Sequence, residues 1–125
     1  MYIAAPIALV LIGLFALFQL ALASGAPFGH FAWGGKYRVL PKKLRISSLV
    51  AVVIFGVFAA FILSKTDWLP IINNQFVVQV GLWVIFAYLV LMILANGVSQ
   101  SKYERYTMTP ITALLAVCFL VVAIS

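Results

Sequence analysis

Residues that could carry acid–base, metal or nucleophilic chemistry are few, and no Asp, Glu, Lys, Arg or His lies within the long apolar stretches of the chain. Asp67 and Glu104 are the only acids, and His30 is the only histidine. Cys118 has no second thiol, and His30 lacks the partners that a structural site of about four metal ligands needs. We therefore expect no enzymatic activity, no cofactor and no metal site.

Polar residues in two loops offer an alternative, namely catalysis or phosphate binding at the membrane surface. A membrane enzyme that acts on lipids would need His30 and Glu104 to converge within one water-bridged contact. Gly34-Gly35-Lys36 offers backbone N–H groups and a cation, which can hold a phosphate. An interfacial histidine and a flexible turn are the plainer interpretations. If a ligand binds there, a lipid phosphate fits the location best.

Four apolar stretches separate these polar residues. Hydrophobic residues make up 66% of the 125-residue chain and charged residues 8%, which is too apolar for a water-soluble globule of this size. About 20 apolar residues span a hydrocarbon core about 30 Å thick, and backbone in lipid must be helical. We expect an all-α membrane protein, a four-transmembrane-helix bundle forming one domain over 1–125. The predicted helices are 3–23, 46–63, 76–95 and 110–124.

Particular residues indicate where these helices begin and end. The fourth stretch is short, so it must recruit Tyr106 to Thr109, tilt little or lie in thinned bilayer. Asn73 or Asn74 is placed to cap the third helix, and Thr109 to cap the fourth. The first six residues contain no base, and the first apolar run exceeds a signal core of about 7–15 residues, so we expect this helix to be retained.

Basic residues predict the orientation, because they stay on the cytoplasmic side during insertion. Seven of the eight lie in loops 25–45 and 96–109, and only Lys65 lies in loop 64–75. We expect loops 25–45 and 96–109 in the cytoplasm, and loop 64–75 and both termini outside. Each basic residue near the membrane surface contributes about 1 kcal/mol to binding of anionic lipid headgroups. The bases lack the aromatic interleaving typical of nucleic-acid binding, so we expect no nucleic-acid partner.

Polar and small side chains within the predicted helices suggest contacts between them. Gln19 and Tyr88 lie roughly 24 and 18 Å from the outer end by helical rise, so their side chains could meet. A hydrogen bond between them would stabilise the packing of the two helices by about 0.6 kcal/mol. The functional alternative is that the two side chains form a polar spot in a cavity between the hairpins. Gly56, Ala60 and Ser64 recur every four residues and predict close helix packing, within the bundle or against a second copy.

Two pairs of similar segments suggest an internal repeat. Leu22-Ala23-Ser24-Gly25 matches Leu94-Ala95-Asn96-Gly97, and Lys36-Tyr37-Arg38-Val39-Leu40-Pro41 matches the segment 105–110. Two tandem parallel helical hairpins would explain both matches, and transporters built from parallel repeats hold substrate between the halves. General habits of membrane hairpins, such as glycine after a helix and proline at a helix start, are the alternative explanation.

Several segments resemble a family of small bacterial integral membrane proteins with four helices. The similarity lies in Gly25-Ala26-Pro27-Phe28-Gly29, Gly34-Gly35-Lys36, Val39-Leu40-Pro41 and Leu44-Arg45, and in the run from Ser101 to Pro110. No activity is assigned to that family. The resemblance therefore implies a multi-pass protein of the bacterial plasma (inner) membrane and brings no catalytic residues.

We expect a non-enzymatic protein that binds a partner membrane protein or lipid headgroups through loop 25–45. The alternative is a small oligomeric transporter or channel for an apolar or weakly polar solute, which needs a cavity near Gln19 and Tyr88. A homo-oligomer is compatible with either function. The candidate binding residues of the loop are Gly29, His30, Trp33, Gly34, Gly35, Lys36, Arg38, Lys42, Lys43 and Arg45.

Overall fold

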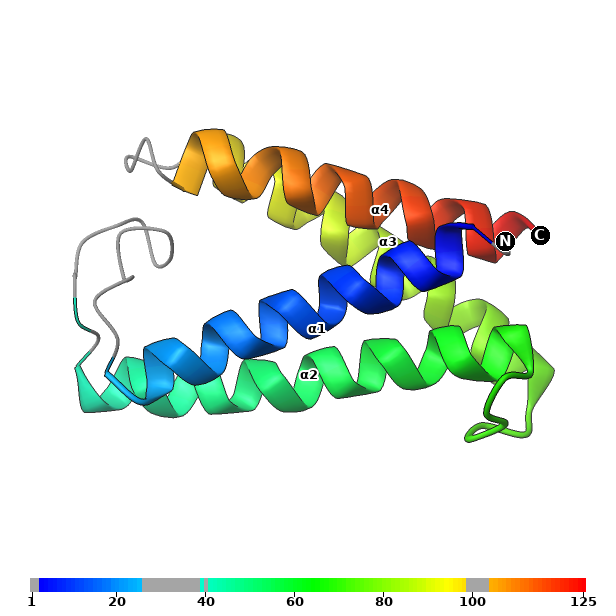
Figure 1. The fold of residues 1–125 in the computed structure, drawn as a ribbon. Helices are drawn as coiled ribbons and strands as arrows, with labels where there is room; N and C mark the ends of the chain where they lie inside the picture. Colours follow the sequence, from blue (N-terminus) through cyan, green and yellow to red (C-terminus); the bar gives the residue numbers. More distant parts are fainter. Residues whose placement is uncertain (1–2, 26–38, 40, 99–103) are drawn as a thin grey trace.

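A computed structural model describes residues 3–25, 39, 41–98 and 104–125. Within these residues the chain forms four α-helices and one π-helix, η3, that continues directly into the last of them (Figure 1). The elements are α1 (Ala4–Ala23), α2 (Lys42–Thr66), α3 (Gln75–Gly97), η3 (Glu104–Met108) and α4 (Thr109–Ile124). The four spans found in this part of the chain are all long and apolar enough to cross a membrane. The predicted all-α four-helix bundle is confirmed.

The helix ends follow from particular residues. Asn74 caps α3, because its Oδ1 accepts hydrogen bonds from two backbone N–H groups at 3.0 and 3.2 Å. α2 begins four residues before the predicted start, since Pro41 fixes the extended backbone just ahead of it, and it ends at Asp67 in the left-handed region (φ 60). The predicted cap at Thr109 is wrong. Thr109 is the first residue of α4, because η3 supplies the preceding turn.

The helices pair as two antiparallel hairpins. α1 packs chiefly against α2, and α3 packs chiefly against α4, while α1 with α4 and α2 with α3 make the smaller contacts between the hairpins. α1 and α3 both begin at the same end of the bundle (Figure 1). The arrangement is thus that of two parallel hairpins, although the origin of the two halves by duplication stays a prediction.

The buried core lies toward one end of the bundle. We call this the closed end, where α1 and α3 begin and α2 and α4 end, and we call the opposite end the open end. The two hairpins diverge toward the open end (Figure 1). The core lies between the closed end and the middle of the helices, and its members from α1, α2 and α3 are Ala5, Ala8, Ile12, Phe58, Ile62, Val78, Leu82, Ile85 and Leu89. α4 adds Leu115, Ala116, Cys118, Phe119, Val122 and Ala123.

Polar contacts join three helices at the closed end. Lys65 Nζ donates to Gln79 Oε1 at 2.9 Å, and Gln79 Nε2 donates to the Ala123 carbonyl oxygen at 2.6 Å. Ser64 ties the following loop to α2, because its hydroxyl donates to the Ala60 carbonyl at 2.7 Å and accepts from Ile72 N at 2.9 Å. These bonds link α2, α3 and α4 around the core.

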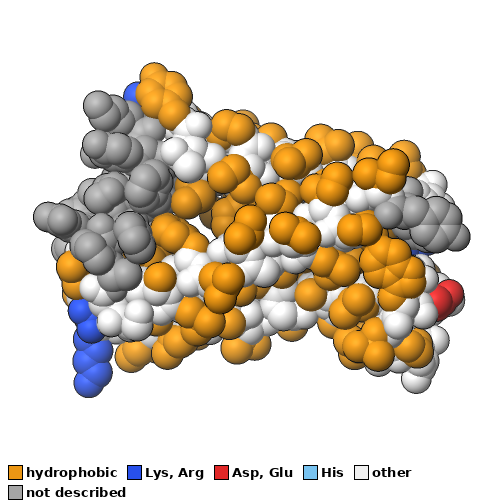
Figure 2. All heavy atoms as spheres, in the orientation of Figure 1, with side chains coloured by type: hydrophobic (Ala, Val, Ile, Leu, Met, Phe, Trp, Pro, Cys, Tyr) orange, Lys and Arg blue, Asp and Glu red, His pale blue; other side chains and the backbone are white. Residues whose placement is uncertain are grey.

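The outside of the bundle is apolar along its length. Val53, Leu17 and Leu91 are 68%, 64% and 64% exposed, and hydrophobic side chains cover the sides of the molecule (Figure 2). Only 17% to 39% of the residues in each span's most apolar window are buried inside the protein. Such a surface is stable in lipid rather than in water, which makes the chain a membrane protein.

Candidate functional site

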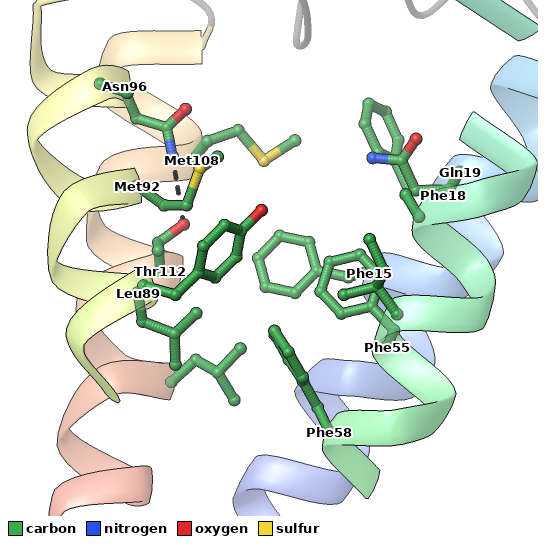
Figure 3. A pocket seen from close by; sticks show the side chains of 15 residues that line it. Phe15, Phe18, Gln19, Phe55, Phe58, Leu89, Met92, Asn96, Met108 and Thr112 are labelled. Atoms are coloured by element: carbon green, nitrogen blue, oxygen red, sulfur yellow. Dashed lines mark hydrogen bonds between the residues drawn. The ribbon is translucent and has the colours of Figure 1, made fainter. Parts of the chain in front are cut away.

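A cavity of about 290 Å³ lies between the two hairpins, on the open-end side of the core (Figure 3). Every helix contributes residues three or four positions apart, the spacing that places side chains on one face. These are Phe15, Phe18 and Gln19 from α1; Ala51, Ile54, Phe55 and Phe58 from α2; Tyr88, Leu89, Met92, Ala95 and Asn96 from α3; and Met108, Thr112 and Leu115 from η3 and α4.

Aromatic rings form much of the cavity wall. Phe15 of α1 stacks on Phe55 of α2, with ring centroids 5.6 Å apart and planes 7° apart. Phe58 meets Tyr88 and Phe119 edge to face, each at a centroid distance of 5.9 Å. Phe58 therefore connects the first hairpin to both helices of the second. Aromatic pairs of this kind contribute about 0.5–1.5 kcal/mol each beyond their buried area.

Polar groups stand on opposite walls of this cavity. The amide of Gln19 points into it from the first hairpin, and Asn96 and Thr112 face it from the second (Figure 3). Asn96 Nδ2 donates to Thr112 Oγ1 at 3.3 Å, so these two buried side chains satisfy each other in part. Gln19 Oε1 is buried and has no hydrogen-bond partner among the residues that the structure describes. An unpaired buried acceptor costs about 1–3 kcal/mol.

Gln19 and Tyr88 therefore line the same cavity, as the functional alternative required. Among the described residues no hydrogen bond joins their side chains, so they do not form the packing contact that their depths suggested. Tyr88 remains 45% exposed, and the cavity is partly open to the surroundings. Asn96 could not be predicted as a lining residue, because the sequence places it in loop 96–109. In the structure Asn96 belongs to the last turn of α3.

The predicted binding loop is only partly covered by the structure. Lys42 and Lys43 are exposed in the first turn of α2, where no acidic residue accompanies them. The Arg45 guanidinium lies against Gly25, just past the last carbonyl groups of α1, where the helix dipole favours a cation. Arg45 is thus engaged within the fold. The remaining candidates, Gly29, His30, Trp33, Gly34, Gly35, Lys36 and Arg38, lie outside the described residues, as does the side chain of Glu104.

The small-residue series on α2 does not pack as one surface within this chain. A Cβ at Gly56 would have nothing within 4 Å, whereas Ser64 is buried and hydrogen-bonded. Of the two alternatives, packing inside the bundle does not hold at Gly56, and packing against a second copy stays a prediction. The close approach of helices occurs instead at Gly81, where a Cβ would overlap with the ring of Phe61.

Residues 3–25, 41–98 and 104–125 include no group of three His, Cys, Asp or Glu side chains that could hold a metal ion. Comparison with protein-family models, curated proteins and solved structures finds no match. The expected family membership stays a prediction. What the chain does must therefore be argued from the cavity and from the charges near it.

Proposed function

We propose that this chain is a non-enzymatic membrane protein that binds a small, mainly apolar molecule between its hairpins. The observation that carries the proposal is the cavity of about 290 Å³, whose wall combines apolar and aromatic side chains with a few polar groups. Small-molecule sites in proteins have this composition. A cavity of about 150 Å³ holds one benzene molecule, so this one has room for about a dozen non-hydrogen atoms.

The asymmetry of the bundle favours binding over an open channel. The core and the Lys65–Gln79–Ala123 hydrogen bonds fill the closed end, while the cavity lies toward the open end. A solute could cross only if that packing separated. In the topology predicted from the basic residues, the open end faces the cytoplasm of a bacterial cell, and the bound molecule comes from the inner leaflet.

The orientation has a direct test. Val39 is 44% exposed and lies at the open end, just before α2. A cysteine introduced by Val39→Cys should resist a membrane-impermeant thiol reagent on intact cells and react after the cells are opened. Labelling on intact cells would place the open end outside, and the source of the bound molecule would then be the outer leaflet.

A pair of substitutions tests the cavity itself. Ala51 lines the cavity, and Ala51→Phe should fill it, whereas Ala87 is exposed on α3 and does not line it. We expect nanodiscs that hold the wild-type protein to retain more naphthalene than empty nanodiscs in equilibrium dialysis. The excess should disappear for Ala51→Phe and persist for Ala87→Phe, with both variants equally helical. Equal retention by the two variants would exclude the cavity as the site.

The exposed bases of α2 favour a second binding function, the one expected from loop 25–45. Lys42 and Lys43 add positive charge to a helix N-terminus whose first turn holds no acidic residue, and basic side chains are visible at the edge of the open end (Figure 2). We propose that they contact anionic lipid headgroups, or an acidic partner membrane protein. Native mass spectrometry should show fewer retained phosphatidylglycerol molecules after Lys42→Gln with Lys43→Gln. Lys65→Gln, at the closed end, is the control, and an equal loss there would contradict the proposal.

A further inference from the structure

The amide of Gln19 turns its nitrogen toward the cavity. In Figure 3 the side chain comes from the first hairpin, with Nε2 on the cavity side and Oε1 turned away from it. Oε1 is enclosed by the protein, so only Nε2 can contact a molecule in the cavity. Among the described residues, neither atom of this amide makes a hydrogen bond. What Gln19 offers to a ligand is therefore a hydrogen-bond donor.

The polar side chains of the opposite wall leave this donor to the ligand. Asn96 and Thr112 bond to each other at 3.3 Å, and in the described part of the chain no hydrogen bond crosses the cavity from Gln19 to either of them. An N–H group without an acceptor is unfavourable in apolar surroundings. A ligand that carries an acceptor relieves this cost. A carbonyl oxygen, which has two lone pairs and no net charge, is such an acceptor.

The walls around Gln19 favour an aromatic ring in the rest of the ligand. Phe15 lies one helical turn before Gln19 and stacks on Phe55. Met92 and Met108 face these rings from the second hairpin (Figure 3). Contacts between aromatic rings, and between sulfur and aromatic rings, are both attractive. A ring placed between the hairpins can make contacts of both kinds.

Charge narrows the class further. The described residues that line the cavity include no acidic or basic side chain. Burial of an unpaired ion in such surroundings is strongly unfavourable, so the ligand is neutral. We infer that the cavity binds a neutral aromatic carbonyl compound whose oxygen accepts a hydrogen bond from Gln19 Nε2, an assignment that rests on the proposed function.

Two probes of nearly equal size and shape test this assignment, together with naphthalene. They are the ketone 1-indanone and 1-methyleneindane, in which a CH2 group replaces the carbonyl oxygen. Binding to protein in nanodiscs is measured by equilibrium dialysis, with the uptake by empty nanodiscs subtracted for each probe. The readout is the ratio of the two affinities, ketone over alkene. Gln19→Leu should lower this ratio about five- to tenfold, because it removes the hydrogen bond that only the ketone can accept.

The control is Met92→Leu, which changes the opposite wall without removing a donor and should keep the wild-type ratio. If the wild-type protein binds none of the three probes, the proposed function itself fails. If it binds naphthalene but the ratio is the same in Gln19→Leu, the assignment to Gln19 is overturned while the cavity remains a binding site. An equal fall of the ratio in Met92→Leu also overturns it. Gln19→Met provides the same readout if the leucine variant does not fold.

Discussion

Substitution of Gly81 by alanine tests how closely α2 and α3 approach each other. A Cβ at this position would overlap with Cε1 of Phe61 and lie 2.6 Å from its Cδ1 and Cζ, whereas carbon atoms pack at about 3.5–4.0 Å. The overlap of more than about 1 Å must be relieved by rotation of the ring or by separation of the helices. Overpacking of this kind costs about 1–3 kcal/mol. Against it stands the gain of about 0.8–1 kcal/mol that alanine brings to a helix over glycine.

The matched control is Gly56→Ala on α2, where nothing lies within 4 Å of the added atom. That variant should gain the full helix propensity, so Gly81→Ala should be about 1–3 kcal/mol less stable than Gly56→Ala. The free energy of unfolding is measured by SDS titration in mixed micelles, followed by circular dichroism. In a Phe61→Ala background the penalty at Gly81 should vanish. Equal stability of the two alanine variants, or a penalty independent of Phe61, would refute the proposed contact.

Three further substitutions should lower the free energy of unfolding in the same assay. Asn74→Ala should cost about 1 kcal/mol, because two N–H groups at the start of α3 lose their acceptor. Gln79→Leu should cost about 1 kcal/mol, because it removes two hydrogen bonds at about 0.6 kcal/mol each. Gln79 accepts one from Lys65 and donates the other to the carbonyl oxygen of Ala123 in α4. Gly25→Ala should cost about 1–2 kcal/mol, because φ is 97° there and the added atom would lie 3.2 Å from the Arg45 guanidinium.

Each of these substitutions has a neighbouring control. Asn73→Ala should have little effect, because Asn73 is exposed and does not cap α3. Gly25→Asn should be milder than Gly25→Ala, since asparagine tolerates the left-handed region better. For Gln79, the variant Lys65→Met removes only one of the two bonds, so it should cost about half as much. Equal losses within any of these pairs would contradict the corresponding contact.

The sequence predicted the membrane-spanning elements well and their ends less well. Hydropathy marks where lipid contact begins, not where a helix begins. α2 therefore starts at Lys42, four residues before the apolar run, because a helix can carry lysines into the headgroup region. The short fourth run recruits residues before it, one of the three alternatives that its length left open, since its span starts at Arg105. The recruited turn is a π-helix, which no residue pattern announced.

Only the depth of the cavity in the membrane could be predicted from the sequence. Helical rise placed Gln19 and Tyr88 at similar depths, and both line the cavity. Which face each helix turns inward could not be read from the sequence, because nearly every face is apolar when lipid is the solvent. The contributions of Phe15, Phe55 and Met108 therefore became visible only in the structure. The contact at Gly81 could not be predicted for the same reason. The evenly spaced small residues on α2 instead predicted close packing on a face that has nothing within 4 Å at Gly56.

The distribution of burial among the helices bears on how the protein is made. In α4, 39% of the residues in its most apolar window are buried, against 17% to 22% in the other three. The helix that emerges from the ribosome after the other three is thus the most buried of the four. The first hairpin can form alone, since its two helices are neighbours in sequence. Until α4 joins the bilayer, however, Phe58 lacks its contact with Phe119, so an early-terminated chain would insert without acquiring its native interior.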